Sequence, residues 1–283
     1  MKTKIIKHFL WLAVLPLLWG CSSEENFLSE EYPLMLSAQV EGASAPIPGS
    51  VSDIGDVGVF VSGGISYNNA KYTGTSGRLT PQKQGYWGST GNISIYAYAP
   101  YQTGSLTSVS VKTDQSLNSN YTASDFLYAA SETFTFANRN NISLTFKHHL
   151  SRINLTLVTG DGVNAAELSN ATIQITGANT TATITLSGVL MTPNNIQAIT
   201  PNGDGTNKYK AIVIPQTVSA GTALFEATIG ARSFEYILPV EQKFRTGEQY
   251  NYTLTLSQGG ITVSPAEIIK WTEDLKDNNG IAN

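Results

Sequence analysis

Residues 142–157 read ISLTFKHHLSRINLTL, and this stretch decides the class of fold. Apolar and polar residues alternate through it, which is the pattern of a half-buried β-strand. The apolar positions change parity part-way along, since Leu144 and Phe146 are even whereas Ile153 and Leu155 are odd. A shift of one residue turns every side chain to the other face of a sheet, so we expect a bulge here or a strand that leaves one hydrophobic core for the next. Either arrangement suits a junction between two β-domains.

Two adjacent histidines, His148 and His149, lie at this change of parity. Side chains of neighbouring strand residues point to opposite faces, so the pair is poorly placed to share one metal ion. We interpret one of them, with His148 as the candidate, as a buried and hydrogen-bonded packing residue of the junction.

Alternating apolar residues recur in short segments along most of the chain. They include Val57, Val59 and Val61; Ile93, Ile95 and Ala97; Ile173 and Ile175; and Ile184 and Leu186. Breaks rich in Gly, Asn and Pro separate the segments and supply the backbone conformations that turns need. No amphipathic helix of crossover length lies between them, although residues 164–169 could form one helical turn. The pattern therefore predicts an all-β fold of antiparallel β-sandwiches.

The first 20 residues have the pattern of a secretory signal peptide. Three lysines, the last of them Lys7, precede an apolar run from Phe9 to Leu18. A transmembrane helix is the alternative, but the run is shorter than the roughly 20 residues that a bilayer requires. Leu18-Trp19-Gly20-Cys21 resembles a lipobox, and Cys21 is the only cysteine in 283 residues. We expect a lipidated Cys21 to hold the protein at a membrane without a spanning helix.

The composition argues against several classes of function. Beyond residue 20 the chain has 14 basic and 21 acidic side chains, a formal charge of −7 with histidine neutral, which argues against nucleic acid as a partner. No Gly-x-Ser-x-Gly, His-Glu-x-x-His or phosphate-loop motif occurs, so we predict neither an enzyme nor a cofactor. Residues 202–205, Asn-Gly-Asp-Gly, lack the closing glutamate of an EF-hand and are interpreted as a polar turn.

Four stretches resemble the fimbrillin family, the pilus subunits of Bacteroidetes that are exported as lipoproteins. They are DVGVF at 56–60, ISIYAYAPY at 93–101, DFLYA at 125–129 and FKHHLSRI at 146–153. A closing pattern that includes Tyr250, Tyr252 and Trp271 follows them. The acidic Ser22-Ser23-Glu24-Glu25 after the cysteine is similar to the surface-export tag of Bacteroidetes lipoproteins, or is simply a solvated linker.

The resemblance implies two tandem β-sandwich domains of the transthyretin-like or Greek-key type. We place them at 32–147 and 148–283, after a signal peptide at 1–20 and a lipid-anchored linker at 21–31. The resemblance also implies a non-enzymatic subunit of a cell-surface fimbria, in an anchor, accessory or tip role in adhesion. Its partners would be other fimbrial subunits joined by β-strand exchange, the outer membrane through Cys21, and host or bacterial surface ligands. His148 and Trp271 would pack in the closing motif.

The candidate strand for exchange is YPLMLSAQV at 32–40. One face of it is apolar and is predicted to fill a groove in the first domain, so that its removal would admit a neighbour's strand. The residues of that face are Leu34, Leu36, Ala38 and Val40. No Lys or Arg lies between Cys21 and Ala70, which argues against trypsin-like removal of this strand. Residues 261–283 are the candidate donor segment, but their polar end predicts a poor one.

Two alternatives stay open. A surface glycan-binding lipoprotein is the second candidate function, because sugars stack on exposed aromatic rings, and Trp87 is the candidate platform unless it packs on the core. The tail from Ser264 is either a capped helix or an extended strand over 266–271, and the resemblance favours the strand.

Overall fold

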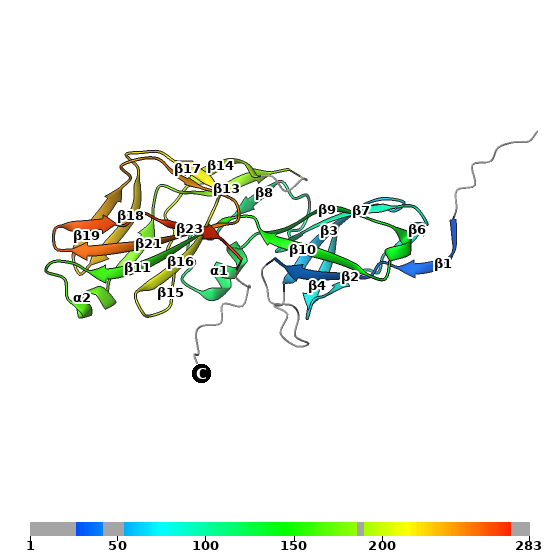
Figure 1. The fold of residues 1–283 in the computed structure, drawn as a ribbon, viewed down its shortest axis with the longest axis horizontal. Coiled ribbons are helices and arrows are strands. Elements are labelled where there is room, and N and C mark those ends of the chain that lie inside the picture. The colour runs from blue at the N-terminus through cyan, green and yellow to red at the C-terminus, as the bar shows by residue number, and fades with distance from the viewer. Residues whose placement is uncertain (1–26, 42–53, 186–189, 273–283) are drawn as a thin grey trace, which may run out of the picture.

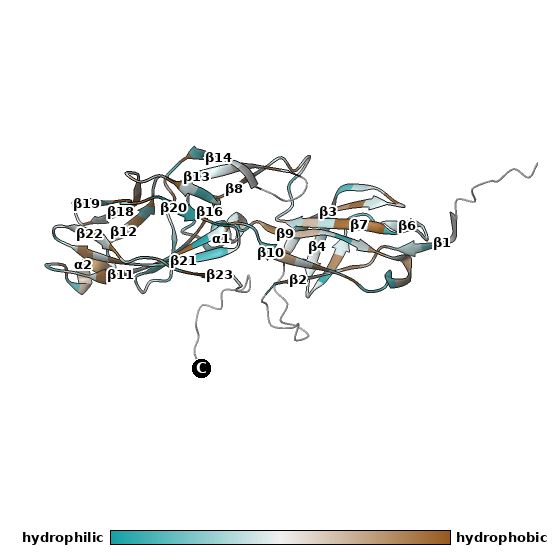
Figure 2. Cartoon of the chain, turned by 45° about the horizontal axis from the view of Figure 1, so that its top comes forward, coloured by the Kyte–Doolittle hydropathy of each residue, from teal (hydrophilic) through white to brown (hydrophobic). Residues whose placement is uncertain are grey.

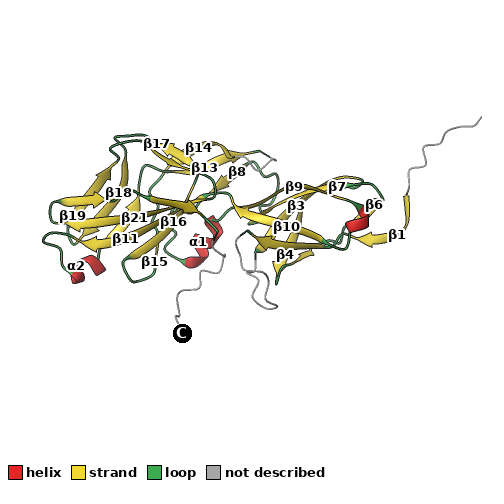
Figure 3. Cartoon of the chain, viewed as in Figure 1, coloured by secondary structure: helices red, strands yellow, loops and turns green. Residues whose placement is uncertain are grey.

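Two bodies of β-structure lie end to end in the computed structural model, which describes residues 27–41, 54–185 and 190–272 (Figure 1). The all-β prediction is confirmed, since strands dominate and the described helices are short (Figure 3). These helices are α1 (Asn118–Ser124), α2 (Ala165–Ser169) and the 3-10 turn η1 (Phe136–Asn138). Within the described part of the chain, no helix is long and apolar enough to cross a membrane. The predicted signal peptide at 1–20, Cys21, the acidic stretch at 22–25 and residues 273–283 lie outside the described residues.

Seven strands of the first body form a closed hydrogen-bonded path around one hydrophobic core. In order around the path they are β10 (Ile142–His148), β2 (Leu36–Val40), β5 (Arg78–Pro81), β4 (Tyr67–Thr75), β3 (Gly55–Gly63), β7 (Ile93–Ala99) and β9 (Leu127–Phe134). The alternation predicted from the sequence places Val57, Val59 and Ile95 inside this core. Because the path is closed, every strand in it has a hydrogen-bonded neighbour on both sides.

A two-stranded ribbon extends the first body at the end away from the second. In it β1 (Phe27–Pro33) pairs antiparallel with β6 (Tyr86–Ser89). Tyr32 packs edge-to-face on Phe136 with ring centroids 5.1 Å apart, and the Arg139 guanidinium lies over both rings. This aromatic contact fixes the chain just before β2.

The second body packs several sheets around a larger core. One sheet contains β15 (Asn202–Gly203), β16 (Lys208–Val213), β11 (Ser151–Thr159) and β21 (Glu248–Ser257), with β22 (Gly260–Val263) and β23 (Glu267–Lys270) both paired to β21. The others are β12 (Thr172–Ile175) with β18 (Ala223–Ile229) and β19 (Arg232–Ile237); β14 (Leu190–Ile196) with β13 (Asn179–Ile184) and β8 (Ser108–Ser110); and β17 (Gln216–Val218) with β20 (Gln242–Phe244). Hydrophobic and hydrophilic residues alternate along many of these strands (Figure 2). The predicted helical turn is α2, which Asn164 caps.

The change of parity in the opening stretch is a break between two strands. β10 ends at His148 and β11 begins at Ser151. Leu144 and Phe146 pack in the core of the first body, whereas Leu150 and Ile153 pack in that of the second. Of the two expected arrangements, the chain therefore takes the one in which it leaves one core for the next.

One segment of the first half of the sequence crosses into the second body. β8 pairs with β13, and Leu106, Val109 and Val111 pack in the second core. The outer face of the first body joins the same cluster through Phe60 and Tyr98. Residues on both sides of 147/148 therefore contribute to the second core. The domain boundary at this position stays a prediction.

Two strand pairs are parallel, which the expectation of antiparallel sheets did not include. They are β2 with β10 and β11 with β21. Parallel neighbours require a long connection, and here most of each body lies between the two strands of its pair. Local alternation cannot reveal such a pairing, because it reports only the face on which a side chain lies.

Candidate functional site

β2 is wedged between β5 and β10 and supplies one wall of the first core. It runs parallel to β10, with Leu36 opposite Ile142 and Val40 opposite Phe146, and antiparallel to β5. Four alternate side chains of the β2 segment, by which we mean residues 32–41, are buried; they are Leu34, Leu36, Ala38 and Val40. Full burial of a leucine or valine side chain contributes about 1.5–3 kcal/mol, so this strand stabilises the body substantially.

Hydrogen bonds outside the regular ladder hold both ends of this segment. The Leu34 amide donates to the Gly85 carbonyl and the Ser37 hydroxyl donates to the Ile142 carbonyl, at 2.8 and 3.0 Å. At the other end the Glu41 amide donates to the Phe146 carbonyl at 2.8 Å. The segment is therefore a separate strand that satisfies the backbone groups of two neighbours.

The Glu41 carboxylate lies where the two bodies meet. One oxygen is 3.3 Å from Lys147 Nζ at the end of β10, and the other is 3.0 Å from Lys270 Nζ on β23. The hydrogen bond from Lys270, aided by Lys147, holds the pKa of Glu41 below its ordinary value. A single carboxylate thus joins one cation from each body.

His148 and Trp271 pack face to face beside this carboxylate. Their ring centroids are 3.9 Å apart with 8° between the planes, and both residues are buried. Asp125 lies 3.0 Å from His148 Nδ1, and the Trp271 amide donates to the Gly247 carbonyl. The aromatic stack fastens the chain after β23, which confirms the extended form of the tail.

A cavity of about 450 Å³ opens at this junction. Charged groups of both signs and both histidines line it, together with exposed Ile268 and Ile269 of β23.

Nowhere among the described residues do three or more His, Cys, Asp or Glu side chains gather as a metal site. In the predicted polar turn, the Asp204 carboxylate accepts hydrogen bonds from the amides of Thr206 and Lys208.

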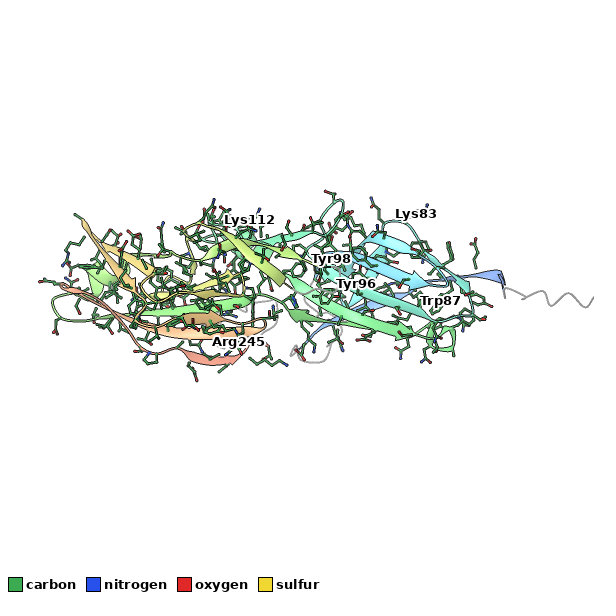
Figure 4. All side chains as sticks on the ribbon, turned by 90° about the horizontal axis from the view of Figure 1, so that it is seen from above. Lys83, Trp87, Tyr96, Tyr98, Lys112 and Arg245 are labelled. Atoms are coloured by element: carbon green, nitrogen blue, oxygen red, sulfur yellow. The ribbon has the colours of Figure 1, made fainter. Side chains whose placement is uncertain are left out.

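Both described tryptophans are covered by protein. Trp87 (Figure 4) is 3% exposed and packs edge-to-face on Phe136. Trp271 is 4% exposed in the stack on His148. Neither ring can serve as an open sugar platform. The observation that motivated glycan binding through Trp87 is therefore removed.

Sequence reasoning missed the charged group formed by Glu41, Lys147 and Lys270. Each lies next to a residue already singled out, since Glu41 follows Val40, Lys147 precedes His148 and Lys270 precedes Trp271. Their convergence depends on the parallel pairing of β2 with β10 and on the docking of β23. No signal in the local sequence predicts either of these.

Comparison with known proteins identifies the family. The fimbrillin-like family model matches residues 53–271, most of the chain. The chain belongs to the fimbrillin-like family. This confirms the resemblance inferred from the four strand motifs.

A curated relative of this fimbrillin-like chain comes from Bacteroides uniformis and is assigned as fimbrium subunit Fim1C. The two are 28% identical over 140 residues, and the match spans 46% of each chain, so it covers about half the length of that relative. Two crystal structures assigned as cell adhesion proteins have a similar fold. One, from Bacteroides uniformis, is 22% identical with a TM-score of 0.66, covering 85% of this chain and 98% of the other. The second, from Bacteroides ovatus, is 18% identical with a TM-score of 0.65, covering 86% and 98%.

Proposed function

We propose that this protein is a structural subunit of a cell-surface fimbria, assembled by β-strand exchange and involved in adhesion. The observation that carries the proposal is β2, a separate strand seated between two partners with its apolar face buried. A neighbouring subunit could supply such a strand through main-chain hydrogen bonds, with alternate side chains setting the register. Membership of the fimbrillin-like family and the fimbrium-subunit relative support this function over glycan binding.

We further propose that Cys21 is lipidated and anchors the subunit in the outer membrane. Five residues lie between Cys21 and the start of β1 at Phe27, and the six residue steps that this makes span at most about 22 Å in an extended chain. The β1 end of the molecule would then face the membrane, while the second body would project outward (Figure 1). This orientation suits an anchor or accessory subunit at the base of a fimbria.

The groove is tested by comparing three shortened proteins. One begins at Ser22, one at Pro33, which removes only β1, and one at Pro46, which also removes β2. We expect the first two to be monomeric in size-exclusion chromatography and the third to aggregate or oligomerise, because β5, β10 and the core lose their cover. A synthetic peptide of residues 32–41 should restore a monomer. A stable monomer beginning at Pro46 with an unchanged melting temperature would contradict the proposal.

A further inference from the structure

Glu41 occupies the one position of the β2 segment where a charged side chain meets both bodies. Val40, the last apolar residue, is buried, and the next side chain turns toward Lys147 and Lys270. These lysines come from β10 and β23, elements more than 100 residues apart in the sequence. The end of the groove is therefore marked by two ammonium groups that face a single carboxylate.

The other carboxylate at this cavity, Glu248, has partners of its own. It accepts a hydrogen bond from the Tyr250 hydroxyl at 2.7 Å and lies 3.6 Å from an Arg245 nitrogen. Removal of β2 together with Glu41 would leave the cavity with Lys147, Lys270, His148 and His149 along its wall. The vacated groove would then end in a positive potential that favours an incoming carboxylate.

We propose that the strand which replaces β2 is selected by an acidic residue at its β23 end. The fitting partner is a strand with small or aliphatic side chains at four alternate positions, followed by Asp or Glu at the place of Glu41. This inference rests on the proposed strand exchange and specifies the chemistry of the donor. The apolar positions supply affinity, and the carboxylate fixes how far the strand slides in the groove.

The chain's own carboxy-terminal residues do not have this pattern. Residues 273–283 read EDLKDNNGIAN, in which apolar residues do not alternate over four positions. A second copy of this chain is therefore a poor donor through that segment. The partner is a different subunit whose donor strand ends in an acid.

The test uses the full chain from Ser22 onward, without the lipidated Cys21. A site-specific protease sequence is placed between Gly42 and Asp53, and the folded protein is cut there, so that the β2 segment stays bound but is no longer covalently joined. Fluorescent peptides of residues 32–41, with Glu41 or with Glu41→Gln, then compete for the groove, and anisotropy gives their affinities. Two exposed ion pairs predict that the Glu peptide binds about three- to tenfold more tightly.

Two controls show whether the difference in affinity between the peptides comes from the charge of Glu41 or from a change in the folded groove. High salt should remove the difference between the peptides, because exposed pairs are screened. The Lys147→Gln, Lys270→Gln double variant should also remove it, whereas Lys83→Gln with Lys112→Gln, which deletes the same charge elsewhere on the surface, should not (Figure 4). Equal binding of both peptides to the wild-type groove would overturn recognition of the carboxylate and leave strand exchange intact. If neither peptide displaces the cut segment, strand exchange itself fails, and this inference fails with it.

Discussion

At the scale of single residues, Trp271 is the side chain that holds β23, the last described strand, against the rest of the protein. The four residues of β23 are all exposed, and Trp271 immediately after them is buried against His148. Strand pairing to β21 adds main-chain hydrogen bonds over only four residue pairs. The indole therefore supplies most of the apolar burial that keeps β23 in place.

Trp271→Ala should release β23 without unfolding the protein. Loss of a buried aromatic ring costs about 3–5 kcal/mol in a core, and here the cost falls on one edge strand. We expect the amides of residues 267–270 that donate to β21 to exchange at least tenfold faster, whereas amides of β21 that donate to β11 should stay protected. Trp87→Ala, which removes an equally buried ring from the first body, is the matched control and should leave these amides protected. Unchanged hydrogen exchange in Trp271→Ala would show that strand pairing with β21 alone is enough to hold β23 in place.

At the scale of elements, the approach of β3 to β7 depends on the absence of a side chain at Gly58. A Cβ there would clash with the ring of Tyr98, which is fully buried and donates its hydroxyl proton to Asn69 Oδ1. The ring cannot move aside, because the Gln102 amide donates to the same hydroxyl.

Gly58→Ala should therefore destabilise the protein by about 1–3 kcal/mol, the usual cost of overpacking. Chemical denaturation measures this. Gly259→Ala is the control, since no atom lies within 4 Å of the added carbon, and it should leave the midpoint unchanged. Equal midpoints for the two variants would mean that Tyr98 can repack.

The elements also show which structural features local sequence can predict. Alternation predicted the strands, because each segment has one apolar face that must be buried. The parity change at 146–153 predicted either a bulge or an exit from the first core, and local sequence did not decide between them. Parallel pairing and the crossing of β8 into the second body escaped prediction, since both depend on contacts between residues far apart in the chain. At the site, the buried face of β2 was predictable for the same local reason. The partners of Glu41 were not, because Lys147 and Lys270 meet only in the folded molecule.

At the scale of the whole molecule, aromatic side chains make the two bodies one continuous structure. Phe60 stacks on Tyr96 on the outer face of the first body, with ring centroids 4.5 Å apart. Phe60 and Tyr98 belong to the core cluster of the second body. Figure 4 labels Tyr96 and Tyr98. The crossing segment around β8 fills the space between the two bodies. Unfolding of either body should then disturb the other.

The two tryptophans beyond residue 20 report on this coupling separately. In a protein beginning at Ser22, Trp271→Phe leaves only Trp87 in the first body, and Trp87→Phe leaves only Trp271 at the junction. We expect fluorescence and circular dichroism to give coincident denaturation midpoints in each variant. Adding Phe60→Ala should separate the midpoints of the two bodies. Separate midpoints without that change would show that the bodies unfold independently.

The parallel pairing of β2 with β10 also constrains the timing of folding. Ser37 and its hydrogen-bond partner Ile142 are 105 residues apart, so β2, the earliest strand of the closed path, cannot pair with β10 until nearly the whole first body has been synthesised. Such long-range closure is slow compared with the formation of local hairpins. For the exported subunit proposed above, this order would keep the last wall of the closed path open until nearly all of the first body has crossed the membrane.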